Sequence, residues 1–249
     1  MKVAIIFIGT GKYINFLPKF YENVEKYFLP RYYENIKEYF LPNTEKTFLV
    51  FTDGEGDFPE DVKVYPQEHL EWPFITLKRF EILNSARDEI VKNDWLVFID
   101  ADALVVGKIL EEDFFTNKPL FGVHHPCHAL GMPPHTKYPG AFETNTKSLA
   151  HITESDDTSV YYQGCLWGGK VPEVCDMINT LIEGINIDLE NDVIALWHDE
   201  SHMNKYFIKN KDLVHTLGPE YAYPEVFSEY CDFEPKIIHL KKDNPKYQK

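Results

Sequence analysis

The sequence predicts an α/β protein built on a mostly parallel central sheet. Short apolar runs recur at residues 3–8, 47–51, 95–99 and 120–123, and longer stretches with helical periodicity separate them. Parallel strands that helices cover on both faces have this alternating pattern. Each run also ends in polar or small residues, and the carboxyl edge of such a sheet is where ligands bind.

The segments that follow the four runs are therefore expected to line one edge of the sheet. They are residues 9–13, 52–54, 100–102 and 124–125. The first, Gly9-Thr10-Gly11-Lys12-Tyr13, lacks the flanking glycines and the Lys-Ser or Lys-Thr pair of the phosphate-loop patterns, so it is weak as a motif.

A 12-residue unit is repeated in tandem after the first run. Residues 16–27 (FLPKFYENVEKY) recur as residues 28–39 (FLPRYYENIKEY), and Phe40-Leu41-Pro42 follows. Proline suits the first turn of a helix but breaks its interior. We therefore expect two short helices or one sharply kinked pair over residues 16–42, without a catalytic role.

Composition limits the class of protein. The chain has 249 residues, 44% of them hydrophobic, which is enough for one large domain. Its formal charge of −15 repels nucleic acid and anionic membranes, so no nucleic-acid partner is expected. No stretch approaches the ~20 apolar residues of a membrane span, and no Cys-x-x-Cys pair occurs. We expect a soluble, cytoplasmic protein without stable membrane insertion.

The run at residues 95–99 (WLVFI) ends abruptly in Asp100-Ala101-Asp102. If the chain stays extended, both carboxylates leave it on one face. Oxygen ligands of this kind suit Mg²⁺ or Mn²⁺ better than Zn²⁺. A solvated loop after a buried strand explains the tripeptide equally well.

The second segment in which acidic and other potentially catalytic side chains are concentrated is residues 197–207 (WHDESHMNKYF). Apolar residues at helical spacing predict a helix that begins after His198 or Asp199, with Asp199 or Ser201 as its cap. Glu200 would then lie in the first turn, where the helix dipole favours the ionised carboxylate. Helix capping alone would also explain both acidic residues.

Other segments leave two interpretations open. Residues 124–159 contain four prolines and few periodic apolar positions, which predicts a long loop or lid. Two helices are expected after it, at residues 173–185 and 201–209, and an extended tail at residues 241–249. His124, His125, Cys127 and His128 are potential zinc ligands without the usual ligand spacing. Residues 161–169 (YYQGCLWGG) suit either a sugar platform or buried strand packing.

Taken in order, these segments resemble the retaining glycosyltransferases that include the histo-blood-group A and B transferases, α-1,3-galactosyltransferase and their bacterial relatives. The resemblance runs from about Val3 to Tyr247, and its most specific part is residues 197–207, which is similar to the family's Trp-His-Asp-Glu-Ser-His-Leu-Asn-Lys-Tyr with Met203 in place of leucine. Residues 76–80, 100–102, 125–126 and 161–169 are similar in order and roughly in spacing.

The resemblance implies a single GT-A catalytic domain over residues 1–249 and a nucleotide-sugar site at the carboxyl edge of the sheet. It implies transfer of galactose or N-acetylgalactosamine from a UDP-sugar to a galactoside, on an oligosaccharide or glycolipid, with α-1,3 linkage and retained configuration. The implied cofactor is Mn²⁺, with Mg²⁺ as the alternative.

By position, the resemblance also assigns roles to individual residues. The catalytic carboxylate is Glu200, and the metal ligands are Asp100 and Asp102. The donor contacts are Ile8, Gly9, Thr10, Tyr13, Arg79, Asp100, Gln163, Asp199 and Lys242. The acceptor contacts are His125, Trp197 and Glu200.

Two departures from the family pattern carry expectations of their own. Many bacterial relatives have Asn-x-Asn where this chain has Asp100-Ala101-Asp102, so we expect metal dependence here. Cys165 is larger than glycine and would crowd an acetamido group, which favours galactose slightly.

Two rival classes are weighed against the transferase. Phosphatases of the haloacid dehalogenase group also use a strand that ends in Asp-x-Asp with magnesium, but near the N-terminus and with Thr or Val where this chain has Leu104. The other rival is a lectin-like or nucleotide-sugar-binding protein with weak turnover, or a UDP-sugar hydrolase.

Overall fold

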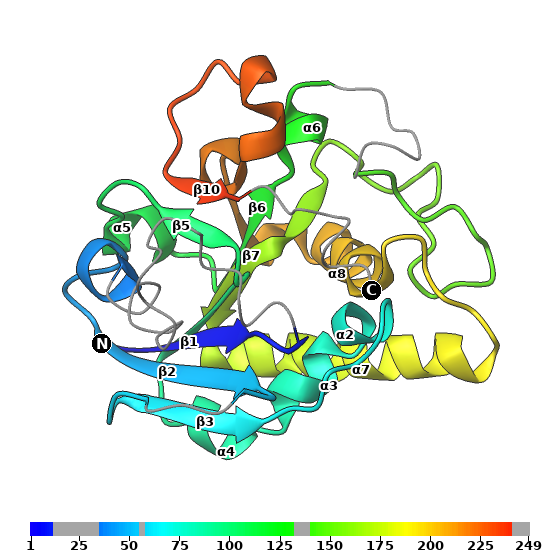
Figure 1. Ribbon diagram of the computed structural model, residues 1–249. Helices are drawn as coiled ribbons and strands as arrows, with labels where there is room; N and C mark the ends of the chain where they lie inside the picture. Colours follow the sequence, from blue (N-terminus) through cyan, green and yellow to red (C-terminus); the bar gives the residue numbers. More distant parts are fainter. Residues whose placement is uncertain (12–34, 55–57, 132–139, 241–249) are drawn as a thin grey trace.

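The computed structural model describes residues 1–11, 35–54, 58–131 and 140–240. Its centre is a seven-stranded sheet in the order β3-β2-β1-β4-β7-β6-β8 (Figure 1). Only β7 runs antiparallel to its neighbours β4 and β6, so the predicted mostly parallel sheet is confirmed. The strands are β1 (Lys2–Ile8), β2 (Glu45–Thr52), β3 (Val62–Pro66), β4 (Trp95–Ile99), β6 (Leu120–His124), β7 (Tyr162–Lys170) and β8 (Val214–Leu217).

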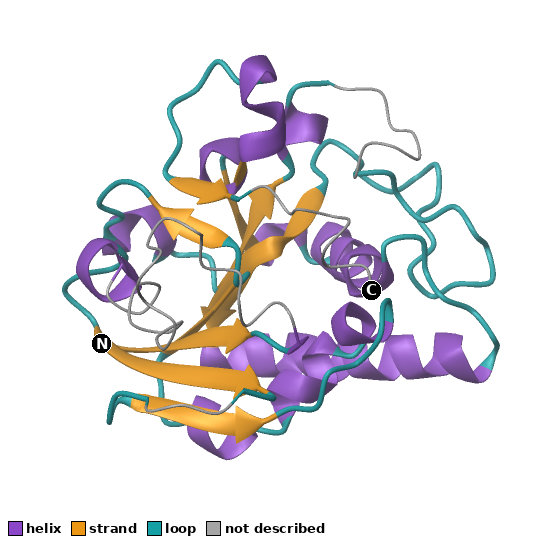
Figure 2. Cartoon of the chain, in the orientation of Figure 1, coloured by secondary structure: helices purple, strands orange, loops and turns teal. Residues whose placement is uncertain are grey.

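Most helices pack against one face of this sheet, and the helical residues 35–39, the short helix at 111–114 and a small second sheet contribute to the hydrophobic cluster on the other face (Figure 2). The helices are α2 (Phe74–Leu77), α3 (Arg79–Asn84), α4 (Arg87–Ile90), α7 (Val171–Glu190) and α8 (His198–Lys209). The small sheet has the order β5-β10-β9, with β5 (Ala103–Val105), β9 (Tyr223–Pro224) and β10 (Ile237–His239). The short elements are α5 (Glu111–Phe114), α6 (Pro126–Ala129), η2 (Lys211–Leu213), η3 (Pro219–Ala222) and η4 (Glu225–Tyr230).

The four apolar runs predicted as strands are all strands, because their side chains are buried between two hydrophobic clusters. The predicted helices at 173–185 and 201–209 correspond to α7 and α8, which are both longer. The loop predicted at 124–159 contains only α6 among its described residues. Of the duplicated unit, residues 35–39 are helical, and residues 12–34 lie outside the described part.

The aromatic and glycine-rich segment at residues 161–169 lies almost entirely in the central strand β7. Its side chains are mostly buried, as the interpretation as buried strand packing predicts. Trp167 is fully buried and stacks on Phe98 with ring centroids 5.2 Å apart. A Cβ atom at Gly168 would lie 2.1 Å from the carbonyl oxygen of Leu96 on β4. Only glycine therefore allows β4 and β7 to pair this closely.

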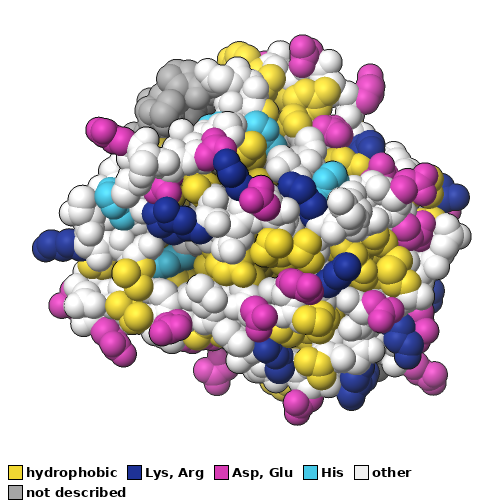
Figure 3. Space-filling model, turned by 180° about the vertical axis from the view of Figure 1, so that it is seen from behind, with side chains coloured by type: hydrophobic (Ala, Val, Ile, Leu, Met, Phe, Trp, Pro, Cys, Tyr) yellow, Lys and Arg dark blue, Asp and Glu magenta, His cyan; other side chains and the backbone are white. Residues whose placement is uncertain are grey.

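The face opposite to the view of Figure 1 has basic side chains interspersed with acidic ones among the described residues (Figure 3). In the described part of the chain, no helix is both long enough and apolar enough to cross a membrane.

Replacement of Gly168 by alanine tests the packing of β7. We expect Gly168→Ala to lower the free energy of unfolding by about 3 kcal/mol or more, because a methyl group would collide with backbone rather than with a flexible side chain. Gly107→Ala is the matched control, since a Cβ there meets nothing within 4 Å. Urea unfolding of both variants measures the difference, and equal stabilities would contradict the close pairing.

Candidate active site

The segment after β1 is tied to the segments after β2 and β3. The Gly9 N–H donates to the carbonyl of Phe51 at 2.9 Å, and the Gly11 N–H donates to the Asp53 carboxylate at 2.8 and 2.9 Å. The Thr10 hydroxyl lies 3.1 Å from Nδ1 of His69.

Ile8, Gly9 and Thr10 thus lie at the carboxyl edge as predicted, and Tyr13 lies outside the described residues. His69 is a neighbour that the sequence did not indicate.

Arg79 is the buried cation of the site. It begins α3, and its Nε lies 3.1 Å from Oδ2 of Asp199 on α8. Its Nη1 donates to the carbonyl of Gly164 on β7, and its guanidinium lies 4.6 Å from the centre of the Phe98 ring. Burial lowers the pKa of Arg79, but the carboxylates of Asp199 and Asp100 raise it above its ordinary value. A permanent positive charge therefore connects three elements of the chain.

Both carboxylate oxygens of Glu200 are held. Oε1 accepts from the Tyr161 hydroxyl at 2.7 Å, and Oε2 accepts from the Gly164 N–H at 2.7 Å. Burial nevertheless raises the pKa of Glu200 to about 7, against these two hydrogen bonds, which lower it. Burial therefore works against the ionised form that the start of a helix favours, and the Glu200 carboxyl titrates near neutral pH.

Asp199 is also strongly shifted. Burial raises its pKa to about 6, although the neighbouring guanidinium of Arg79 lowers it. Two carboxyl groups that titrate near neutrality, side by side at the start of a helix, are typical of a functional site.

The start of α8 differs from the prediction. The helix begins at His198, and neither Asp199 nor Ser201 caps it. Asp199 pairs with Arg79 instead, and the Ser201 hydroxyl accepts from the Trp197 N–H at 2.9 Å. His198 has a φ of +52° and packs edge to face on Trp72, with ring centroids 4.6 Å apart.

Asn204 is a positioning residue that the sequence analysis missed. Its amide accepts from the Tyr162 N–H at 2.7 Å and donates to the Tyr162 carbonyl at 2.8 Å. This pair of bonds fixes α8 against β7 beside Glu200. The only signal in the sequence was a polar residue on the inner face of a helix.

The Asp100–Asp102 segment is a turn, so the predicted extended continuation of the strand is wrong. The Ala103 N–H donates to the Asp100 carbonyl at 3.1 Å as the chain reverses into β5. Asp102 is 5% exposed, which excludes a solvated position for this carboxylate. Its Oδ1 lies 3.7 Å from Nδ1 of His239 on β10.

Cys165 lies on the same side of β7 as this turn. Its thiol is buried against His239, and burial raises its pKa, so it stays protonated. Burial lowers the pKa of His239, but Cys165 and Asp102 raise it well above its ordinary value.

The predicted acceptor contacts His125 and Trp197 are buried or partly buried. His125 is buried at the start of α6, and its Nδ1 accepts from the Cys127 N–H at 3.1 Å. Burial, with the neighbouring His128, lowers its pKa to about 3, so the ring is neutral. Among the described residues, Nε2 of His125, Nε1 of Trp197 and Oε1 of Gln163 are buried atoms without a hydrogen-bond partner.

Two other sequence expectations have no support here. His124 and His128 lie close together, with Nε2 and Nδ1 2.9 Å apart, but within the described part of the chain no three His, Cys, Asp or Glu side chains form a group that could hold a metal ion. Lys242 lies outside the described residues.

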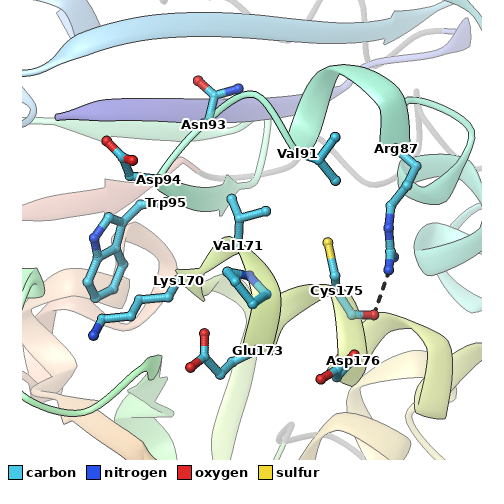
Figure 4. Close-up of a pocket in the computed structure, with 11 residues that line it drawn as sticks. Arg87, Val91, Asn93, Asp94, Trp95, Lys170, Val171, Glu173, Cys175 and Asp176 are labelled. Atoms are coloured by element: carbon cyan, nitrogen blue, oxygen red, sulfur yellow. Dashed lines mark hydrogen bonds between the residues drawn. The ribbon is translucent and has the colours of Figure 1, made fainter.

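A cavity of about 700 Å³ lies elsewhere, at the amino end of β4 and the start of α7 (Figure 4). Trp95 and Val171 line it, and Arg87 donates from its wall to the carbonyl of Cys175 at 3.3 Å. None of the predicted site residues lines this cavity.

Comparison with known proteins agrees with the geometry. The profile of the family described as Glycosyltransferase family 6 matches residues 1–244. The chain is 31% identical over 247 residues to the O-antigen biosynthesis glycosyltransferase WbnI of Escherichia coli, covering 98% of this chain and 96% of that protein.

Animal proteins are similar at lower identity. The histo-blood group ABO system transferase 2 of Rattus norvegicus is 28% identical over 96% of this chain and 68% of its own length. The globoside alpha-1,3-N-acetylgalactosaminyltransferase 1 of Homo sapiens is 25% identical over 90% of this chain and 62% of its own length.

The raised pKa of Glu200 has a consequence for stability. Its pKa is about 7 in the folded protein and its ordinary value is 4.5, so the folded state holds this proton more tightly than the unfolded state. The contribution of Glu200 to stability is therefore greatest below pH 4.5 and falls as pH rises through 7.

We expect Glu200→Gln to stabilise the free protein at pH 8 by about 2 kcal/mol, because the half-buried carboxylate then no longer has to ionise. At pH 4.5 the advantage should vanish. Urea unfolding at both pH values measures it, and a variant that is less stable than wild type at pH 8 would argue against the shift.

Proposed function

The chain belongs to glycosyltransferase family 6, and from this premise we propose that it is a metal-dependent, retaining α-1,3-glycosyltransferase. It would move galactose or N-acetylgalactosamine from a UDP-sugar to a galactoside-type acceptor, as a single catalytic domain. The observation that carries the proposal is the cluster of Arg79, Asp199, Glu200 and Gly164 at the carboxyl edge of the sheet.

The names of the relatives support the reaction class. They describe an O-antigen glycosyltransferase and an alpha-1,3-N-acetylgalactosaminyltransferase, so glycan acceptors are the natural substrates to test. Family membership also removes the phosphatase alternative.

The described cysteines are free thiols, which suits a reducing compartment such as the cytosol as the proposed location.

The donor would lie across the segment after β1 and the Asp100–Asp102 turn. Ile8, Gly9 and Thr10 would hold the uridine, in a segment that Asp53 and His69 keep in place. Arg79 would contact the donor near Asp100, and Lys242 would neutralise a phosphate. A net charge of −15 makes such local cations necessary for binding a diphosphate.

The divalent cation would be held by Asp100 and Asp102. Carboxylate oxygens suit Mn²⁺ or Mg²⁺. The bound cation supplies Lewis-acid stabilisation of the leaving diphosphate. Since the described residues form no three-ligand group, diphosphate oxygens would complete its coordination.

Glu200 would act on the anomeric carbon. Cleavage of the sugar from the diphosphate builds positive charge there, and an ionised carboxylate stabilises that charge or attacks the carbon as a nucleophile. The Tyr161 hydroxyl and the Gly164 N–H hold both oxygens, so the carboxylate is oriented before substrate arrives. Double displacement and front-face attack both agree with this arrangement.

The acceptor would bind beside His125 and Trp197. Buried polar atoms without partners are costly, and the hydroxyl groups of a sugar would satisfy Nε2 of His125 and Nε1 of Trp197. A hydroxyl group of the donor sugar would likewise donate to Oε1 of Gln163.

The proposal is tested by release of UDP from a panel of UDP-sugars, with Mn²⁺ or with a chelator, and with or without a lactose-type acceptor. We expect Mn²⁺-dependent release from a galactose-type donor that the acceptor accelerates. Release that no acceptor changes would instead indicate a hydrolase, and silence across the panel would indicate a binding protein.

The role of Glu200 has its own test. We expect Glu200→Gln to lower kcat by about 10³-fold, because the amide can neither stabilise positive charge as a carboxylate does nor attack the anomeric carbon. The affinity for UDP should stay within about threefold, well under 1 kcal/mol. The exposed Glu183→Gln on α7 is the control. Unchanged turnover in Glu200→Gln would remove Glu200 from the mechanism.

A further inference from the structure

Glu143 is a buried carboxylate that the proposed mechanism does not use. It is 5% exposed and lies in residues 140–159, the second part of the segment predicted as a long loop or lid. Both of its oxygens accept backbone N–H groups: Oε1 accepts from Asn145 at 2.7 Å, and Oε2 accepts from Leu196. The first bond is local, but the second joins residues 53 positions apart. Glu143 therefore connects this segment to the residue that directly precedes Trp197.

The same segment lies against the other predicted acceptor contact. A Cβ atom at Gly140 would lie 3.8 Å from Cγ of His125 and 3.7 Å from Cδ1 of Tyr161, so the backbone of Gly140 packs on both rings. The ring of Phe142 packs edge to face on Tyr161, with centroids 5.0 Å apart. In Figure 1 the segment runs from the region of α6 past α8. This stretch of chain therefore connects His125 to Leu196.

Both acceptor contacts present a buried N–H group. Nδ1 of His125 accepts from the Cys127 N–H at 3.1 Å, and since the ring is neutral, its proton is on Nε2. The indole Nε1 of Trp197 is also a donor. Neither atom has a hydrogen-bond partner among the described residues. Two buried donors at a set separation would bind two oxygen atoms of a sugar, because each donor is costly without a partner.

We propose that Glu143 is a positioning residue that sets the separation of the His125 and Trp197 donors and thereby the affinity for the acceptor sugar. This inference rests on the proposed function, which supplies the acceptor. Since backbone N–H groups occupy both oxygens of Glu143, it acts through the backbone of Leu196 and of its own segment. An ionised carboxylate suits this role because it only accepts hydrogen bonds.

The kinetic test separates transfer to an acceptor from hydrolysis of the donor. We expect Glu143→Gln to raise the KM for a lactose-type acceptor by about tenfold or more, because the amide NH2 group then meets a backbone N–H that needs an acceptor. Hydrolysis of the UDP-sugar without acceptor should stay within about twofold. Arg79 and Glu200 are held by groups to which Glu143 makes no hydrogen bond.

Asp188→Asn is the matched control for a structural effect. Asp188 is 2% exposed, and its carboxylate accepts from the Leu149 N–H at 2.8 Å and from the Ser148 hydroxyl. It therefore anchors the same segment at Ser148 and Leu149 rather than beside Trp197. We expect Asp188→Asn to lower the free energy of unfolding without raising the KM for the acceptor.

Hydrogen exchange tests the anchor without any turnover. In Glu143→Gln we expect the Leu196 amide to exchange about tenfold faster or more, while the amides of β4 keep their protection. Glu143→Asp keeps the charge but is one methylene shorter, so it should also raise the KM for the acceptor. This second variant decides the point if Glu143→Gln does not fold.

The outcomes separate this inference from the proposed function. If Glu143→Gln lowers transfer and hydrolysis equally, Glu143 has only a structural role, and the inference is overturned while the transferase proposal stands. An unchanged KM for the acceptor, or unchanged exchange at Leu196, also overturns it. If the wild-type protein releases UDP from no donor, the proposed function fails and the inference fails with it.

Discussion

The buried ion pair between Arg79 and Asp199 is the interaction on which the rest of the site depends. It joins α3 to α8, and through the Gly164 carbonyl it also joins both helices to β7. Breaking a buried pair by removing one partner typically costs about 3 to 5 kcal/mol, because the other charge is left uncompensated in the interior. Glu200, the next residue after Asp199, accepts from the Gly164 N–H. One residue of β7, Gly164, therefore holds the cation through its carbonyl and the carboxylate through its N–H.

The same burial that orders this site opposes the ionisation of its acids. Asp199 and Glu200 have pKa values of about 6 and 7, so the free protein carries carboxyl groups poised between their two protonation states. In the proposed reaction, the positive charge that develops at the anomeric carbon would favour the ionised form, and the buried surroundings would strengthen that attraction. Burial of Glu200 therefore has two effects: ionisation of the carboxyl lowers the stability of the free protein, and the same carboxylate attracts positive charge more strongly in the proposed reaction.

The antiparallel strand β7 explains why the chemistry gathers where it does. Its neighbours β4 and β6 run the other way, so the amino end of β7 meets their carboxyl ends. Tyr161, Gln163 and Gly164 consequently lie beside the Asp100–Asp102 turn and His125. The close approach of β4 and β7 requires Gly168. The small sheet then brings His239 to the same edge from the last part of the described chain.

The sequence by itself determined the alternation of strands and helices, four of the six parallel strands and the motif at residues 197–207. These features depend on local periodicity and on nearby residues, which a single sequence displays. Only the tertiary structure decided the turn at Asp100–Asp102, the start of α8 without an Asp199 cap and the positions of β7, Asn204 and His239. Each of these depends on contacts between residues far apart in the chain: Arg79 withdraws Asp199 from capping, β5 turns back toward β10, and burial shifts Glu200 toward its protonated form. Local pattern cannot show such contacts, because their energies arise only when distant segments are packed together and water is excluded.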